Sequence, residues 1–184
     1  MAHSRARYLT HLITRGLGFK GIVGIFGHRQ VGKTTLLEHL SKRYTTLDSA
    51  RELARSMDNP EGFLEELTRK PGHFPVGIDE CQLSPPLFPA LKDFVRTNKR
   101  PGIFLLSGSV RFSSRKAIKE SLTGRLLSYE LLPFSISELE QRPINSLPLN
   151  LFGADFLKYR WPGLPGAKAS PAALEKYLEL GGLP

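Results

Sequence analysis

Apolar positions along the chain form two kinds of run, short continuous ones and longer ones with a repeat of three to four residues. Continuous apolar runs of strand length lie at 21–26, 44–47, 74–78, 103–106 and 126–132. Runs with helical spacing lie at 5–15, 33–43, 50–56, 60–69, 86–98 and 114–122. Strands that alternate with helices are typical of βαβ units. The pattern therefore predicts an α/β fold around a mainly parallel sheet.

The composition changes after residue 142. Residues 143–171 contain five prolines and three glycines, which is typical of a linker or a loosely packed insertion. A last helical pattern over 172–180 ends at Gly181-Gly182. We therefore expect a globular domain over 1–142, a linker or insertion over 143–171, and the start of a further region over 172–184.

A glycine-rich loop stands between the first predicted strand and the helix that follows it. The loop and its continuation consist of Gly27, His28, Arg29, Gln30, Val31, Gly32, Lys33, Thr34 and Thr35. This order fits the pattern Gly-x-x-x-x-Gly-Lys-Thr, in which glycines allow backbone N–H groups to surround phosphate oxygens at a helix N-terminus. Lys33 is expected to reach the β- and γ-phosphates of ATP, and the Thr34 hydroxyl to bind Mg²⁺. Arg29 and Gln30 either contact the nucleotide or remain solvated.

Two adjacent acids end the third predicted strand. Asp79 is placed to hold Mg²⁺, and Glu80 to act as the general base that polarises water against the γ-phosphate. Their alternative role is to begin a helix, where the helix dipole favours acids. Cys81 stands beside them, and its preferred interpretation is a small buried apolar residue.

Three further residues are candidates for the catalytic machinery. Ser107 and Ser109 follow the strand at 103–106, and ligands of open α/β sheets lie at that edge. A hydroxyl there could sense the γ-phosphate, or it could simply end the strand. Arg125 could neutralise transition-state charge in its own chain or in a neighbouring subunit, or it could be a solvated surface residue.

These segments together resemble a known family. The segments are 27–37, Ile-Asp-Glu-Cys-Gln at 78–82, Leu-Leu-Ser-Gly-Ser at 105–109, Leu-Thr-Gly-Arg at 122–125, and the segments 130–139 and 177–184. They are similar to the prokaryotic AAA+ ATPases in which an AAA domain is followed by a DUF4143 region. The resemblance implies a P-loop NTPase domain over 1–142, a three-layer α/β/α fold, and a five-stranded sheet of order 5-1-4-3-2. It also implies that the chain is truncated, because family members continue beyond the motif at 181–184.

The same resemblance assigns roles to the candidate residues. It makes Lys33, Thr34, Asp79 and Glu80 the residues of the two nucleotide-binding motifs. It makes Ser107 or Ser109 the sensor-like position and Arg125 the finger-like arginine.

Charge and composition add partners to this picture. The formal net charge is +9, which favours contact with nucleic acid or other acidic partners but also suits a nucleotide site. Basic residues occur at Lys99-Arg100 and at Arg111, Arg115, Lys116 and Lys119. No apolar run approaches the ~20 residues of a membrane span, and the N-terminus lacks the apolar centre of a secretory signal. We therefore expect a cytoplasmic protein without a membrane partner.

The sequence predicts an ATPase that binds ATP and Mg²⁺ and couples hydrolysis to a conformational change. The alternative is a nucleotide-dependent module that binds DNA or protein with little or no turnover. A homo-oligomer is the partner expected if Arg125 acts between subunits. A small-molecule kinase is disfavoured, because no acceptor pocket or lid is recognisable and Asp79-Glu80 favours water as the acceptor.

Overall fold

The computed structural model describes residues 6–70, 72–109, 118, 121–139, 141, 175, 178 and 179. The chain divides into two compact units, one over Leu9–Leu132 and one that combines Met1–Tyr8 with Pro133–Leu183. The larger unit contains the glycine-rich loop and all the predicted site residues. The predicted boundaries at 142 and 171 stay predictions, because residues 142–174 lie outside the described part.

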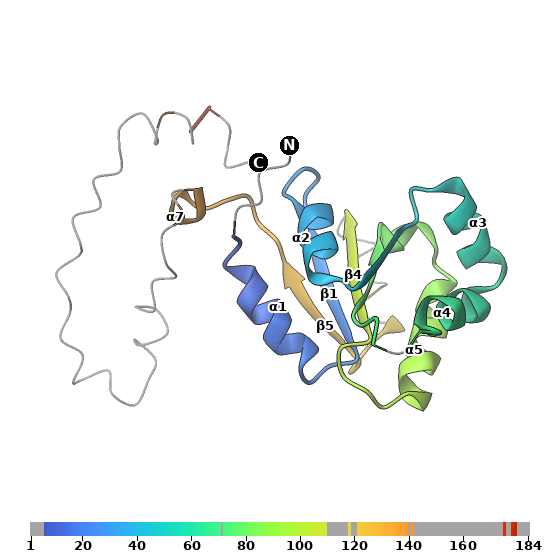
Figure 1. Cartoon of the computed structure of the whole chain (residues 1–184). Coiled ribbons are helices and arrows are strands. Elements are labelled where there is room, and N and C mark those ends of the chain that lie inside the picture. The colour runs from blue at the N-terminus through green and yellow to red at the C-terminus, as the bar shows by residue number, and fades with distance from the viewer. Residues whose placement is uncertain are drawn as a thin grey trace, which may run out of the picture. The chain divides into compact units, whose positions relative to one another are not determined.

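A five-stranded sheet forms the centre of the larger unit (Figure 1). Its strands are β1 (Ile22–Gly27), β2 (Arg43–Thr46), β3 (Val76–Asp79), β4 (Phe104–Ser109) and β5 (Leu126–Glu130). They lie in the order β2-β3-β4-β1-β5, and every neighbouring pair is parallel. This confirms the α/β fold and the predicted strand order 5-1-4-3-2. Because all strands are parallel, their carboxyl ends share one edge of the sheet and their amino ends share the other.

Successive side chains of the central strands enter two separate apolar clusters. On β1, Ile22 and Phe26 belong to one cluster, whereas Val23 and Ile25 belong to the other. All four are at most 1% exposed. A strand that is buried on both faces has no polar alternation, which is why residues 21–26 form a continuous apolar run.

Helices cover both faces of the sheet and complete the expected three layers. The cluster that contains Val23 also receives side chains from α1 (Leu9–Leu17) and α2 (Lys33–Leu40). The cluster that contains Ile22 receives side chains from α3 (Ala50–Asp58), α4 (Pro60–Thr68) and α5 (Leu87–Thr97).

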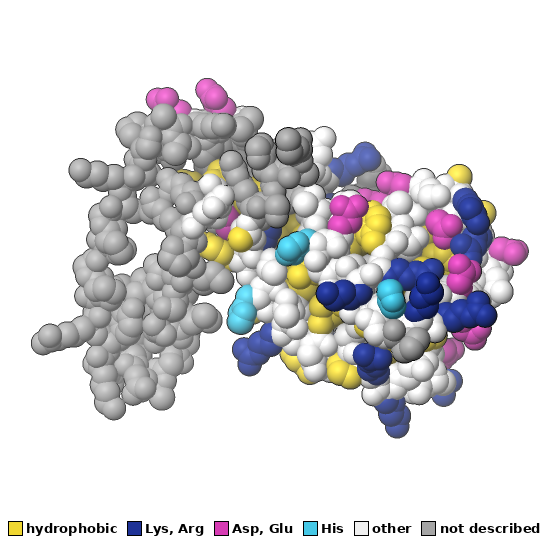
Figure 2. Space-filling view, in the orientation of Figure 1, with side chains coloured by type: hydrophobic (Ala, Val, Ile, Leu, Met, Phe, Trp, Pro, Cys, Tyr) yellow, Lys and Arg dark blue, Asp and Glu magenta, His cyan; other side chains and the backbone are white. Residues whose placement is uncertain are grey.

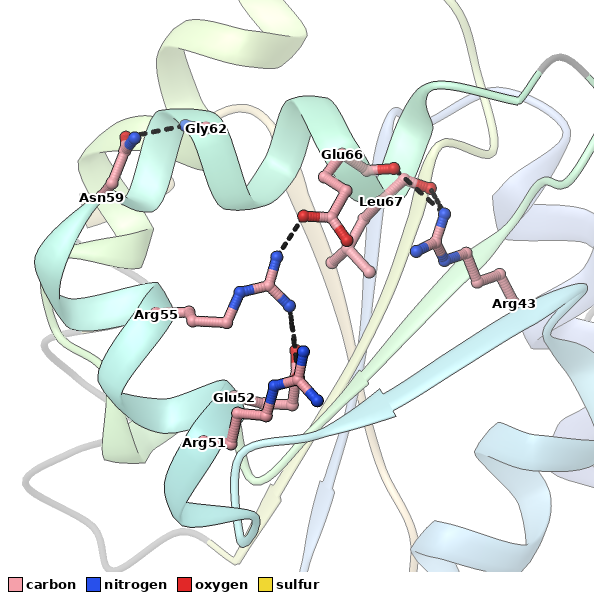
Figure 3. A network of polar contacts seen from close by, with 8 residues as sticks. All are labelled: Arg43, Arg51, Glu52, Arg55, Asn59, Gly62, Glu66 and Leu67. Atoms are coloured by element: carbon pink, nitrogen blue, oxygen red, sulfur yellow. Dashed lines mark hydrogen bonds and ion pairs between the residues drawn. The ribbon is translucent and has the colours of Figure 1, made fainter.

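Ionic and backbone contacts hold α3 and α4 together (Figure 3). Arg55 of α3 lies between Glu52 of its own helix and Glu66 of α4, and it forms an ion pair with each. Arg43 of β2 donates to the carbonyl of Glu66 at 3.0 Å, which satisfies one of the last carbonyls of α4. Asn59 begins α4 by accepting a hydrogen bond from Gly62 N at 2.9 Å.

A capping box organises the described part of the smaller unit. Ser135 and Glu138 exchange hydrogen bonds around the start of the short helix α7 (Ile136–Leu139). Glu138 also accepts from Tyr8 N at 2.9 Å and from Arg7 Nε at 3.2 Å. Burial alone would raise the pKa of Glu138, but these hydrogen bonds and the nearby guanidinium leave it lowered.

Several element boundaries differ from those predicted from the pattern. The third strand begins at Val76 rather than at residue 74, because Pro75 has no N–H to donate to the ladder. The helix predicted over 33–43 ends at Leu40, where Ser41 is already extended with φ −89° and ψ 144°. Of the helix predicted over 114–122, the structure describes residues 118, 121 and 122. Of the last helix, it describes Glu175, Leu178 and Glu179, all of which are helical.

The first loop glycine is required by packing as well as by the loop. A Cβ at Gly27 would lie far inside van der Waals contact of the Leu131 carbonyl oxygen, which belongs to the backbone and cannot rotate away. We expect Gly27→Ala to lower the free energy of unfolding by about 1–3 kcal/mol, measured by urea denaturation. The matched control is Gly21→Ala at the other end of β1, where the new Cβ would meet its nearest atoms at 3.4 Å. Equal stability of the two variants would contradict this account.

Candidate functional site

The glycine-rich loop connects β1 to α2 with two residues of positive φ. Gln30 has φ 63° and Gly32 has φ 91°. These left-handed residues turn the chain so that α2 begins at Lys33, and no side chain caps its N-terminus. The first N–H groups of a helix have no intrahelical acceptor, and together with the helix dipole they form an anion site. The loop therefore has the conformation that a phosphate group requires.

Lys33 is buried within this loop, with 5% of its surface exposed. Its ammonium nitrogen donates to the carbonyl oxygen of His28 at 2.6 Å, so the side chain curls back over the loop. Burial lowers the pKa of Lys33, and the nearby carboxylates of Glu80 and Asp79 offset part of that effect. A buried cation of this kind gains from an anionic partner, which a phosphate can provide.

Asp79 is the point at which the elements of the site meet. Its carboxylate accepts hydrogen bonds from Thr34 Oγ1 at 2.7 Å, Tyr44 OH at 3.2 Å, Glu80 N at 2.9 Å and Ser107 Oγ. The donors come from α2, β2, β4 and the residue that follows β3. Asp79 itself is 2% exposed. The carboxyl edge of the sheet thus brings Thr34, Asp79 and Ser107 together.

The oxygen pair of Thr34 and Asp79 fits a magnesium ion. Mg²⁺ prefers oxygen ligands and is held in nucleotide sites by one or two protein groups, with phosphates and water completing the shell. Thr34 Oγ1 and Asp79 Oδ2 lie 2.7 Å apart at the start of α2, beside the loop that would carry the phosphates. In the part of the chain that the structure describes, no group of three or more His, Cys, Asp or Glu side chains could hold a metal. Phosphate oxygens and water would have to complete the shell of a metal held by Thr34 and Asp79.

Glu80 has an unusual backbone conformation. Its φ of 53° and ψ of 38° are left-handed, and a short 3-10 helix, Cys81–Leu83, starts immediately after it. A left-handed non-glycine residue costs about 1–3 kcal/mol and is often found at functional positions. The Glu80 carboxylate accepts a hydrogen bond from Gln82 Nε2, so the same short turn aims and holds the side chain.

The Ser-Gly-Ser segment at the end of β4 supports both acids. Ser107 is fully buried and donates to Asp79. A Cβ at Gly108 would overlap Gln82 Oε1, so glycine leaves the space that Gln82 needs beside Glu80. Ser109 ends β4 opposite Gly27 in the sheet register, and its side chain lies outside the described residues.

The structure does not bring Arg125 to the loop. Arg125 directly precedes β5, whose first residue, Leu126, pairs with Ile22 at the start of β1. Gly27 and the loop lie at the other end of β1, roughly 17 Å away at ~3.3 Å per residue. Arg125 therefore lies at the opposite edge of the sheet from the phosphate site of its own chain.

The remaining loop residues differ in exposure. His28, Arg29, Gln30, Thr34 and Thr35 are exposed, whereas the Val31 side chain is fully buried in an apolar cluster. Any contact of Val31 with a nucleotide would therefore come from its backbone.

Cys81 is also fully buried, and burial raises the pKa of its thiol, in agreement with the interpretation as a small apolar residue.

Sequence reasoning missed Tyr44 and Gln82. Tyr44 lies on β2, 35 residues from Asp79 in sequence, and the two meet because β2 pairs with β3. Burial and the nearby Asp79 carboxylate raise the pKa of Tyr44 to about 12. The phenol therefore keeps the proton that it donates to Asp79. Gln82 could have been found from its position two residues after the candidate base Glu80, close enough in sequence to contact its side chain.

Comparisons with known proteins identify a family for residues 20–140. No curated protein matches the chain by sequence. Among solved structures, domain III of the replication initiation protein DnaA from Thermotoga maritima is similar, with a TM-score of 0.48 and 18% identity over 78% of this chain and 73% of that chain. No helix among the described residues combines the length and the apolar character needed to cross a membrane. Residues 20–140, which contain the loop, the acid pair and the whole sheet, match the family described as AAA domain, and the chain belongs to that family.

Proposed function

We propose that this chain binds ATP with Mg²⁺ in the loop of Gly27–Thr34. It then hydrolyses the bond between the β- and γ-phosphates, with Glu80 as general base. The observation that carries the proposal is the convergence of Thr34, Asp79 and Ser107 at the uncapped N-terminus of α2. Membership of the AAA domain family supports nucleotide binding in general.

Binding follows from the residues that surround the loop. In the proposed complex, the N–H groups at the start of α2 hold the phosphate oxygens, and Lys33 exchanges the His28 carbonyl for the β- and γ-phosphates. The bound metal would neutralise charge on the phosphates and draw electron density from the phosphorus. Thr34 and Asp79 would hold it, and Tyr44 and Ser107 keep the Asp79 carboxylate in place.

Glu80 is the acid best placed to orient the attacking water. It follows Asp79 directly, and its carboxylate is already held by Gln82. Gln82 Oε1 is buried and has no donor among the described residues. A buried amide oxygen can accept a hydrogen bond from an ordered water. Gln82 would therefore help to place the water that Glu80 deprotonates, and hydrolysis is favoured over transfer to another acceptor.

Coupling of turnover to a conformational change would begin at the strand ends. Ser107 is part of β4 and donates a hydrogen bond to Asp79. A movement of Asp79 on loss of the γ-phosphate would therefore displace the end of that strand. Because Arg125 lies at the far edge of the sheet, it could assist hydrolysis only in a neighbouring copy. A catalytic role for Arg125 would therefore require a homo-oligomer.

Replacement of Lys33 should weaken nucleotide binding. We expect Lys33→Ala to weaken ATP binding by about 10- to 150-fold, the range for loss of a hydrogen bond to a charged group, as measured by isothermal titration calorimetry. Lys42→Ala, which removes an exposed lysine before β2, is the matched control and should bind ATP normally. Unchanged ATP affinity in a folded Lys33→Ala protein would refute the assignment of the loop.

Replacement of Glu80 should separate binding from hydrolysis. We expect Glu80→Gln to bind ATP normally while its turnover falls on the order of 10²-fold or more, as is typical when a general base is lost. Phosphate release measured under saturating ATP tests this. Glu65→Gln, at an exposed position of α4, should keep full turnover. A Glu80→Gln protein with the original rate would show that another group activates the water.

Tyr44 should act through Asp79 and therefore only when magnesium is present. We expect Tyr44→Phe to weaken Mg²⁺-ATP binding by roughly 2- to 10-fold, the cost of one hydrogen bond, and to leave ATP binding in EDTA unchanged. Calorimetric titrations in the two buffers provide the comparison. Tyr129→Phe is the control, because it loses a similar hydroxyl contact, to the Leu12 carbonyl at 2.9 Å, on β5, the edge strand opposite β2. An equal loss in both buffers would exclude a role for Tyr44 at the metal.

A further inference from the structure

A second cavity lies at the amino edge of the sheet, away from the phosphate loop. It has a volume of about 270 Å³, and the lining residues that matter here are Phe19, Lys20, Lys99, Arg100, Gly124 and Arg125. They come from three connections, which precede β1, β4 and β5. Parallel strands place these connections side by side. We call this feature the amino-edge cavity.

Among the described residues, the four cations of the amino-edge cavity have no acidic partner. No described carboxylate lies within salt-bridge distance of Lys20, Lys99, Arg100 or Arg125. The other cavity lined by arginines, near β2, is different, because there Arg51 and Arg55 pair with Glu52 and Glu66. Uncompensated positive charge in a hollow attracts anions. In Figure 2, dark blue lysine and arginine side chains are scattered over the lower part of the larger unit, among apolar and uncharged side chains.

Hydrogen bonds fix the connections that form this cavity. Gly102 N donates to Lys20 O at 2.8 Å, and Ile103 N donates to Gly21 O at 3.1 Å. The ammonium of Lys20 donates to Gly124 O at 3.2 Å, which ties the third connection to the first. The Arg100 guanidinium lies over the Phe74 ring, 4.4 Å from its centroid. Lys20 and Arg100 are thus held in place before any ligand binds.

The size and the aromatic residue restrict the kind of ligand. Enclosed small-molecule pockets usually measure about 300–1,000 Å³, so a cavity of about 270 Å³ is better suited to one segment of a polymer than to a whole cofactor. Phe19 is 59% exposed and so presents an aromatic ring to the solvent beside the cations. Positive charge combined with exposed aromatic rings is the usual means of binding single-stranded nucleic acid without sequence preference.

We propose that the amino-edge cavity binds the sugar-phosphate backbone of single-stranded nucleic acid. Lys20, Lys99, Arg100 and Arg125 contact phosphates, and Phe19 stacks on an unpaired base. A duplex is disfavoured, because its bases are already stacked and the cavity is made of loops rather than of a helix that could enter a groove. This inference does not depend on ATP hydrolysis, because the cavity and the phosphate loop lie at opposite edges of the sheet.

The test measures binding of a fluorescent oligo(dT) to the full chain by anisotropy, without nucleotide, over a series of KCl concentrations. Four phosphate contacts on a single strand predict a slope of about −3 in a plot of log K against log [KCl]. Lys99→Ala should reduce the magnitude of that slope by roughly 0.7. Phe19→Ala should lower the affinity about 5-fold or more at an unchanged slope, as expected for loss of stacking. The control Arg51→Ala removes an exposed arginine outside the cavity and should change neither quantity.

Each other outcome overturns the proposal. Equal losses for Lys99→Ala and Arg51→Ala would mean that oligo(dT) responds to overall charge rather than to this cavity. Preference for duplex DNA, or no effect of Phe19→Ala, would exclude stacking on a single strand. If sedimentation shows that Lys99→Ala changes an ATP-dependent assembly while oligo(dT) binding is normal, the cavity faces a second copy of the chain. ATP turnover, measured separately, should be the same for all these variants, so failure of the ATPase proposal would be visible independently.

Discussion

The buried carboxylate of Asp79 is the interaction on which the candidate site depends. It accepts hydrogen bonds from groups on α2, β2 and β4 and from the backbone N–H that follows it. A buried carboxylate with no partners would be costly, and each of these donors offsets part of that cost. The same bonds fix the end of β3 against the start of α2. One side chain therefore joins the carboxyl ends of the central strands to the helix that follows the glycine-rich loop.

The turn after Asp79 shows how local strain and neighbouring space work together. Glu80 is left-handed, and a conformation of this kind persists only when surrounding contacts maintain it. The hydrogen bond from Gln82 to the Glu80 carboxylate is one such contact. Gly108 makes it possible, because a side chain at that position would overlap Gln82. The segment Ser107-Gly108 thus has two separate tasks, a hydroxyl for one acid and open space for the group that holds the other.

Much of the fold could be predicted from the sequence, because a strand that is buried on both faces appears as a continuous apolar run. Residues 21–26 and 103–106 are continuous apolar runs, and they became the central strands β1 and β4. The predicted strand order places the second strand beside the third, but it does not state which side chains meet, so the contact of Tyr44 with Asp79 could not be predicted. The position of Arg125 was predictable in principle, since a residue that precedes a parallel strand must lie at the amino edge. The sequence predicts a strand at 126–132, which directly follows Arg125.

The acids of the candidate site and the cations of the amino-edge cavity lie at opposite edges of the parallel sheet. The carboxyl edge contains Asp79 and Glu80 beside one buried lysine, whereas the amino edge contains four cations without a described acid nearby. Strand β4 links the two edges directly: Ser107 contacts Asp79 at one end, and the turn at Gly102 bonds to Lys20 O at the other. The strand between them is fully buried, and packed interiors transmit displacement rather than absorb it. A shift of Ser107 would therefore move the walls of the amino-edge cavity, which gives nucleotide state a physical route to whatever the cavity binds.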